Sequence, residues 1–145
     1  MFAQMADILH QFIVRAPATR VYNAFSRPED LINWWPAEST GKAAEGEIYT
    51  LQFGPQYDWR AKVIRAVPGK AFTWKMVHAM DDWMGTEVGI RLTEDKDITI
   101  VDFFHTGWPA ANDHFRISNY CWGYLLAGMK KYIEEGVVIP FERRN

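Results

Sequence analysis

Residues 101–109 read VDFFHTGWP, and a long helical pattern follows them after a short polar stretch. The first segment is typical of a strand that stops at a Gly-Trp-Pro break. The second segment repeats apolar residues at helical spacing: Trp122, Leu125, Leu126, Met129 and Ile133. A single long amphipathic helix after a run of strands has to bury its apolar stripe on the sheet that those strands form. The sequence therefore predicts an α+β domain in which the last helix covers one face of a sheet.

Short segments with alternating apolar and polar residues precede the long helix. We expect one early strand, two short helices, five further strands and the long helix, in this order: 8–15; 17–26 and 28–33; 49–53, 57–63, 72–78, 88–92 and 98–105; and about 113–135. The turns between the later strands are short, so consecutive strands should pair as antiparallel neighbours. Gly136 is a typical signal for the end of the long helix.

Length and composition favour one globular domain. The chain has 145 residues, and we expect a single domain over 1–145 with an ordered core of about 8–138. The tails, Met1 to Ala6 and Ile139 to Asn145, look expendable. Aromatic residues make up 15% of the chain and include seven Trp. Large aromatic side chains suit a sheet that closes on a helix, and equally the walls of a cavity.

Several classes of protein are disfavoured. The formal net charge is -2 and Lys and Arg form no long run, so we expect no nucleic-acid partner. No apolar stretch approaches the roughly 20 residues of a membrane span, and the N-terminus lacks the pattern of a secretory signal. The single cysteine, Cys121, rules out an internal disulfide and fits a reducing, cytoplasmic location.

Some segments resemble a known group of proteins. Phe12–Pro17, followed by Val21 and Ala24, resembles the opening of the START-like superfamily, which also holds the pollen-allergen fold and the polyketide cyclases. Further segments resemble its branch related to the activator of Hsp90 ATPase: Pro28–Leu31 with Trp34-Trp35, His105–Trp108, Trp122-Gly123, Leu126 and Tyr132–Glu134. The resemblance spans nearly the whole chain, with its parts in the family's order.

The resemblance implies a helix-grip fold. A curved antiparallel sheet, six-stranded by the count above, would wrap around the long C-terminal helix and leave a cavity between them, with the two short helices after the first strand. Family members bind lipids, sterols, polyketides or other apolar molecules, and a few catalyse cyclisation or dehydration. Eukaryotic co-chaperones of this branch carry a separate N-terminal domain that acts on the chaperone. The present sequence shows no such domain, so Hsp90 activation is not carried over. A smaller departure is the polar turn Glu94–Asp97, where relatives often have glycines.

Two histidines are the polar candidates for the cavity. His105 is in phase with Val101 and Phe103, so it points inward if they do, and there it could bind a ligand or act as a base near neutral pH. A structural histidine bonded to backbone or to the helix is the alternative. In the opposite phase Asp102 would be buried and would become the acid–base candidate. His78 is in phase with Trp74, and its alternative is a strand-end histidine in solvent.

Aromatic residues at sheet spacing complete the candidate site, either as cavity walls or as core. Trp35, Trp83 and Trp108 lie at the ends of elements, where rims form. The full set of candidate ligand contacts is Trp35, Trp59, Trp74, Met76, His78, Trp83, Phe103, His105, Trp108 and Trp122.

No catalytic residue, cofactor or metal is predicted. Nothing in the sequence places a base beside Cys121 to activate it as a nucleophile. The four histidines lack the spacing of zinc ligands, and the glycines form no phosphate-binding pattern.

Three functions remain open at this stage. The first is a binding protein that holds a small apolar or aromatic ligand between sheet and helix. The second is a cyclase- or dehydratase-like enzyme that uses His105 or Asp102 in the same cavity. The third is a protein-interaction module, such as a chaperone partner, with a filled core and an exposed apolar patch around Trp34, Trp35 and Trp108. Homodimerisation is possible in each case.

Overall fold

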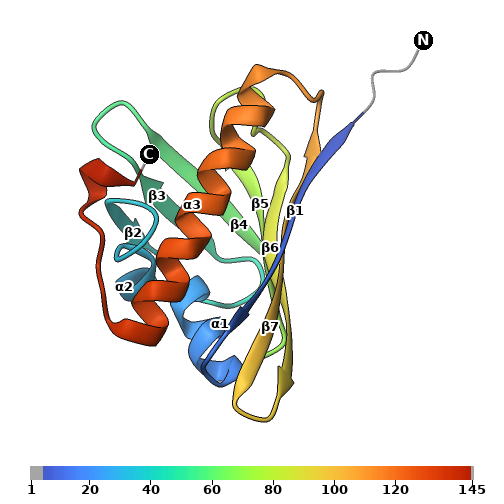
Figure 1. Ribbon diagram of the computed structural model, residues 1–145. Helices are drawn as coiled ribbons and strands as arrows, with labels where there is room; N and C mark the ends of the chain where they lie inside the picture. The colour runs from blue at the N-terminus through green and yellow to red at the C-terminus, as the bar shows by residue number, and fades with distance from the viewer. Residues whose placement is uncertain (1–4, 145) are drawn as a thin grey trace.

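The computed structural model describes residues 5–144 (Figure 1). Its elements follow the expected order: β1 (Ala6–Val14), α1 (Ala18–Ser26), α2 (Pro28–Leu31), β2 (Glu38–Thr40), β3 (Ile48–Gln52), β4 (Asp58–Val67), β5 (Ala71–His78), β6 (Glu87–Asp95), β7 (Ile98–Trp108), α3 (Asp113–Glu135) and η1 (Phe141–Arg143). The fold is α+β, with an antiparallel sheet and a long C-terminal helix, which confirms the predicted helix-grip architecture.

The strands form one antiparallel sheet in the order β1-β7-β6-β5-β4-β3-β2. The early strand β1 pairs with the last strand β7, so the first and last strands of the chain lie side by side at one edge of the sheet. Figure 1 shows α3 running across one face of this sheet, with α1 and α2 beside its C-terminal half. The opposite face carries charged side chains, as the alternation predicted: Arg60, Lys62, Lys75 and Arg91 are all exposed.

The long helix begins and ends where the sequence indicated. The side chain of Asn112 caps its first turn by accepting a hydrogen bond from the Phe115 N–H at 2.9 Å. Gly136 takes a left-handed conformation with φ of 71° and donates its N–H to the Tyr132 carbonyl. Within residues 5–144, no helix is both long enough and apolar enough to cross a membrane.

Three details of the predicted fold need correction. The sheet has seven strands, because the short edge strand β2 pairs with β3 and is too brief to show an alternating pattern. The segment after residue 138 was expected outside the ordered core, yet it forms η1 and buries Arg144, which is 6% exposed. At the other end β1 already begins at Ala6, and Met1–Gln4 lie outside the described residues.

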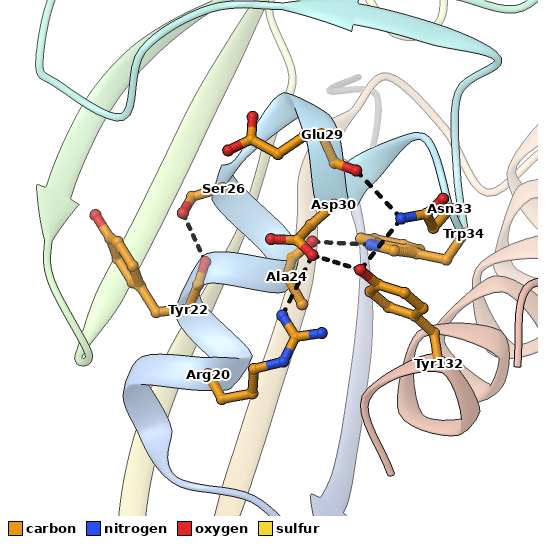
Figure 2. A network of polar contacts seen from close by, with 9 residues as sticks. All are labelled: Arg20, Tyr22, Ala24, Ser26, Glu29, Asp30, Asn33, Trp34 and Tyr132. Carbon is orange, nitrogen blue, oxygen red and sulfur yellow. Dashed lines mark hydrogen bonds and ion pairs between the residues drawn. The ribbon is translucent and has the colours of Figure 1, made fainter. Parts of the chain in front are cut away.

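A polar network joins α2 to the end of α3 (Figure 2). Tyr132 donates its hydroxyl proton to Asp30 and accepts a hydrogen bond from the Asn33 amide at 3.1 Å. Arg20 pairs with the same Asp30 oxygen at 3.3 Å, and its guanidinium lies over the Tyr132 ring. Trp34, next along the chain, donates its indole N–H to the Ala24 carbonyl. This network fixes the loop that carries Trp34 and Trp35 against the rest of the domain.

Candidate ligand-binding pocket

One part of the space between sheet and helix is filled by side chains. The Trp74 ring lies 4.7 Å from Phe72 and 5.2 Å from both Phe25 and Tyr49, measured between ring centroids. The Phe103 ring lies 4.6 Å from Trp122 of α3. All of these residues are buried. We call this region the filled end, and it leaves no room for a ligand.

His105 is fully buried beside Trp83 and Trp108, whose ring centroids lie 4.4 Å and 4.9 Å from its own. Of the two phases that the sequence left open, the structure has the one with Val101, Phe103 and His105 inward, while Asp102 lies on the outer face and accepts a hydrogen bond from Gln11. Both ring nitrogens are occupied. The Trp122 indole donates to Nδ1 at 3.0 Å, which leaves Nε2 to carry the proton and donate to the Thr86 hydroxyl at 2.9 Å.

The surroundings of His105 keep it neutral. Burial, reinforced by the charge of His114, lowers the pKa of His105 to about 3. The chain of hydrogen bonds is complete, because Thr86 donates onward to the Trp83 carbonyl. His105 is therefore the structural histidine that the sequence left as an alternative, and neither it nor Asp102 can reach a ligand as a base.

Another part of the same space holds a pocket of about 570 Å³. It is bounded by α3, by the turns after β3 and β5, and by the C-terminal segment. Its lining residues are Trp35, Phe53, Tyr57, Trp59, Met80, Trp83, His114, Ile117, Ser118, Cys121, Trp122, Leu125, Phe141 and Arg144. The exposed side chains of Tyr57, Met80 and Ile117 mark its mouth. This volume lies within the usual range for small-molecule sites.

Five of the lining aromatic residues form a closed circuit of contacts, which we call the aromatic wall: Trp35, Phe53, Trp59, Trp83 and Trp122. Each ring contacts the next, with centroid distances between 4.7 and 6.0 Å around the circuit. The wall residues come from four different parts of the chain, so only the fold brings them together. Flat aromatic faces of this kind suit a planar apolar molecule.

The polar groups of the pocket are few. His114, in the first turn of α3, places Nδ1 3.0 Å from the Asp82 carboxylate. That contact fixes the ring and leaves Nε2 available. Arg144 enters from the C-terminal segment, where its Nε donates to the Ile139 carbonyl at 2.8 Å and its Nη1 to the Pro36 carbonyl at 3.2 Å.

The residues proposed from sequence separate into three groups. Trp35, Trp59, Trp83 and Trp122 line the pocket. Trp74, Met76, Phe103, His105 and Trp108 are buried outside its lining, because neighbouring aromatic rings fill the space that they face. His78 is exposed and bonds the Asp58 carbonyl, since the β4–β5 register shifts between Arg60 and Ala61 at the end of its strand.

The expectation of an exposed apolar patch, made for an interaction module, is wrong. Trp34, Trp35 and Trp108 are all buried. Trp108 packs under the start of α3 against Phe115, with ring centroids 5.5 Å apart. The Gly-Trp-Pro break therefore turns its tryptophan into the core and not toward solvent.

The sequence reasoning missed several lining residues. His114, Ser118, Cys121 and Leu125 follow the spacing i, i+4, i+7 and i+11 on α3, a second stripe beside the core-facing one. That periodicity could have been noticed. Nothing in the sequence indicated that Arg144 and the residues before it fold back over the helix.

No metal centre is evident in the described part of the chain. Within residues 5–144, no group of three or more His, Cys, Asp or Glu side chains is placed to hold a metal ion.

Solved structures with the same fold cover nearly the whole chain. The Aha1 dimer from Colwellia psychrerythraea is 27% identical, with a TM-score of 0.82 over 91% of this chain and 98% of that one. Protein SSP2350 from Staphylococcus saprophyticus is 21% identical, with a TM-score of 0.77 over 92% and 96% of the two chains. CalU16 from Micromonospora echinospora is 21% identical, with a TM-score of 0.72 over 91% and 78%. The last two likenesses show the fold alone.

The family follows from the sequence itself. A search among curated proteins gave no match. The profile of the family described as "Activator of Hsp90 ATPase homolog 1-like protein" matches residues 15–134, most of the sequence. The chain therefore belongs to the family of activator of Hsp90 ATPase homolog 1-like proteins, a branch of the START-like superfamily.

Proposed function

We propose that this protein binds a small, planar, apolar or aromatic molecule in the pocket between the sheet and α3. The observation that carries the proposal is the aromatic wall, which encloses one side of a pocket of about 570 Å³. A site of this kind, mostly apolar with a few polar groups, is the usual makeup of a ligand pocket. The free thiol of Cys121 supports the cytoplasm as the compartment.

A native mass spectrum of gently purified protein, compared with its denatured mass, tests the proposal first. A retained small molecule supports it directly. Titration with 1-aminoanthracene, a neutral fluorescent aromatic, tests the same site without knowledge of the ligand. We expect saturable binding that slows the alkylation of Cys121 by iodoacetamide, because this lining residue is the only cysteine in the sequence.

Matched variants on α3 locate the binding. Leu125→Trp fills the pocket and should abolish the titration. Tyr124→Trp adds an indole one position away, outside the pocket lining, and should leave binding unchanged. Wild-type protein that neither retains a molecule nor binds the probe contradicts the proposal.

A second candidate is catalysis of the cyclase or dehydratase kind. The observation that favours it is the His114–Asp82 pair, since a carboxylate that orients a histidine can leave its other nitrogen free to accept a proton. His114 then takes the role that the sequence suggested for His105. Comparison of molecules retained by wild type and by His114→Gln decides the point. A dehydratase would yield a molecule lighter by one water with wild type than with the variant, whereas a binding protein would yield the same molecule with both.

We further propose that two copies of the chain associate. The Colwellia psychrerythraea relative is described as a dimer. In this chain the sheet edge formed by β1 carries the exposed apolar residues Leu9 and Ile13. Light scattering after size exclusion should show a dimer that the double change Leu9→Lys and Ile13→Lys converts to a monomer. A wild-type monomer at all concentrations contradicts this.

A further inference from the structure

We propose that the pocket selects aromatic molecules that carry a carboxylate, and that Arg144 receives the negative charge. This inference rests on the proposed binding function and specifies its ligand class. It starts from an unusual placement, because arginine side chains are almost never fully buried without a partner of opposite charge.

Arg144 is 6% exposed and lines the pocket. Backbone carbonyls take up its Nε and Nη1: those of Ile139, Trp35 and Pro36. Among residues 5–144, none of the ion pairs includes Arg144, although Glu142 lies near enough to favour its charged form. Burial lowers the pKa of Arg144 and outweighs the opposing charge of Glu142, the direction expected when a cation is desolvated.

The second terminal nitrogen, Nη2, is the group left for a ligand. It has no acceptor among the described residues, and it is not one of the buried polar atoms sealed from solvent. An N–H of Nη2 can donate to a carboxylate oxygen, while the engaged Nε and Nη1 exclude the usual two-nitrogen clamp. A carboxylate here would form the ion pair that Arg144 lacks among residues 5–144.

The other features of the pocket define the rest of the molecule. The aromatic wall offers stacking faces and few polar groups, so the body of the ligand should be planar and apolar. Phe141 contributes a further ring next to the arginine, whose guanidinium carbon lies 5.8 Å from its centroid. The pocket therefore matches a fused-ring carboxylic acid better than a free inorganic anion or an uncharged hydrocarbon.

The test compares 2-naphthoate with 2-naphthamide, which share a shape and differ in charge. Isothermal titration calorimetry at pH 7.5 should show that wild type binds the acid roughly tenfold or more tightly than the amide, the size of one charge-assisted hydrogen bond. Arg144→Gln should reduce this ratio to about one, mainly through weaker binding of the acid. Arg143→Gln removes the same charge from an exposed neighbouring position and should leave the ratio unchanged.

Each outcome has a defined meaning. No preference for the acid in wild type, or a preference that persists in Arg144→Gln, overturns the inference and leaves the proposed binding function intact. Failure of wild type to bind either compound, or 1-aminoanthracene, contradicts the binding function itself. If Arg144→Gln loses both ligands because the C-terminal segment detaches, Arg144→Lys decides: a retained preference for the acid supports the inference and a lost one overturns it.

Discussion

The filled end and the pocket are built from the same kinds of residue, yet only one of them has space for a ligand. Trp74 and Trp59 lie on neighbouring strands of one sheet, and His105 and His114 lie on consecutive elements. Trp74 and His105 are enclosed on every side, whereas Trp59 and His114 line the pocket. The difference is not in the side chains but in what covers them.

The cover differs because the two regions are closed by different parts of the chain. At the filled end, rings from α1, β3, β5 and β7 meet, with Phe25, Tyr49, Trp74 and Phe103 as their members. At the pocket, turns and the C-terminal segment take the place of strands, and they leave a gap. Trp74 is therefore a core residue because rings from other helices and strands cover it, whereas Trp59 lines the pocket because its neighbours Phe53 and Trp83 leave a gap beside it.

Truncation of Trp74 and of Trp59 should give the largest difference in stability between the filled end and the pocket. Trp74→Ala should lower the free energy of unfolding by about 3–5 kcal/mol, the range for a large aromatic removed from a core. Trp59→Ala, only partly buried, should cost less than half as much while it weakens binding of 1-aminoanthracene. Urea denaturation measures the first effect and fluorescence titration the second. Equal losses of stability would show that Trp59 is core as well.

The buried histidine should make the stability of the fold sensitive to acid. Unfolded His105 binds a proton below about pH 6.5, whereas folded His105 stays neutral down to about pH 3. Its effect on stability is therefore absent above pH 6.5 and destabilising as the pH falls, by up to about 1.4 kcal/mol per pH unit within that window.

The control for this effect is His105→Gln, which cannot titrate. Between pH 6.5 and 5.0 the wild type should lose about 2 kcal/mol more stability than the variant, measured by denaturant unfolding at each pH. Parallel curves for the two proteins would contradict the buried, neutral state of His105.

The network of Figure 2 should support stability without contributing to the pocket. Tyr132→Phe removes the hydrogen bonds to Asp30 and Asn33 and should cost about 1–2 kcal/mol. Tyr120→Phe removes a hydroxyl from a residue that is 75% exposed and should change nothing measurable. Binding of 1-aminoanthracene should stay the same in both variants. A loss of binding in Tyr132→Phe would show that the network also shapes the pocket.

The smallest change in stability is expected in the C-terminal segment that borders the pocket. Phe141→Ala removes a partly exposed ring from the pocket lining and should cost under about 1 kcal/mol, because the ring is not fully buried. The rate of Cys121 alkylation should nevertheless rise, since this thiol lies in the same lining. An unchanged rate would mean that the segment does not limit access to the pocket.

Much of the fold could be predicted because it depends on short-range patterns. The alternation of β3 to β7 and the stripe of α3 each follow from a repeat within one element. The end signal Gly136 lies next to the helix that it terminates. The edge strand β2 escaped prediction because three residues cannot show a period.

The pocket was predicted less well, because its position depends on contacts between distant residues. The sequence left the phase of β7 open between His105 and Asp102, and inward positions at the filled end and at the pocket look alike in a strand pattern. Trp83 lies in a turn and Arg144 near the C-terminus, and no repeat relates either of them to Trp35.

What the sequence alone determined is the set of elements, their order, and the faces that they bury, since backbone hydrogen bonding and the periodicity of apolar residues act locally. What only the tertiary structure decided is which inward side chains are covered by other rings and which border open space. Burial of the same aromatic and histidine side chains depends on the packing of several elements at once, and that packing exists only when the whole chain has folded.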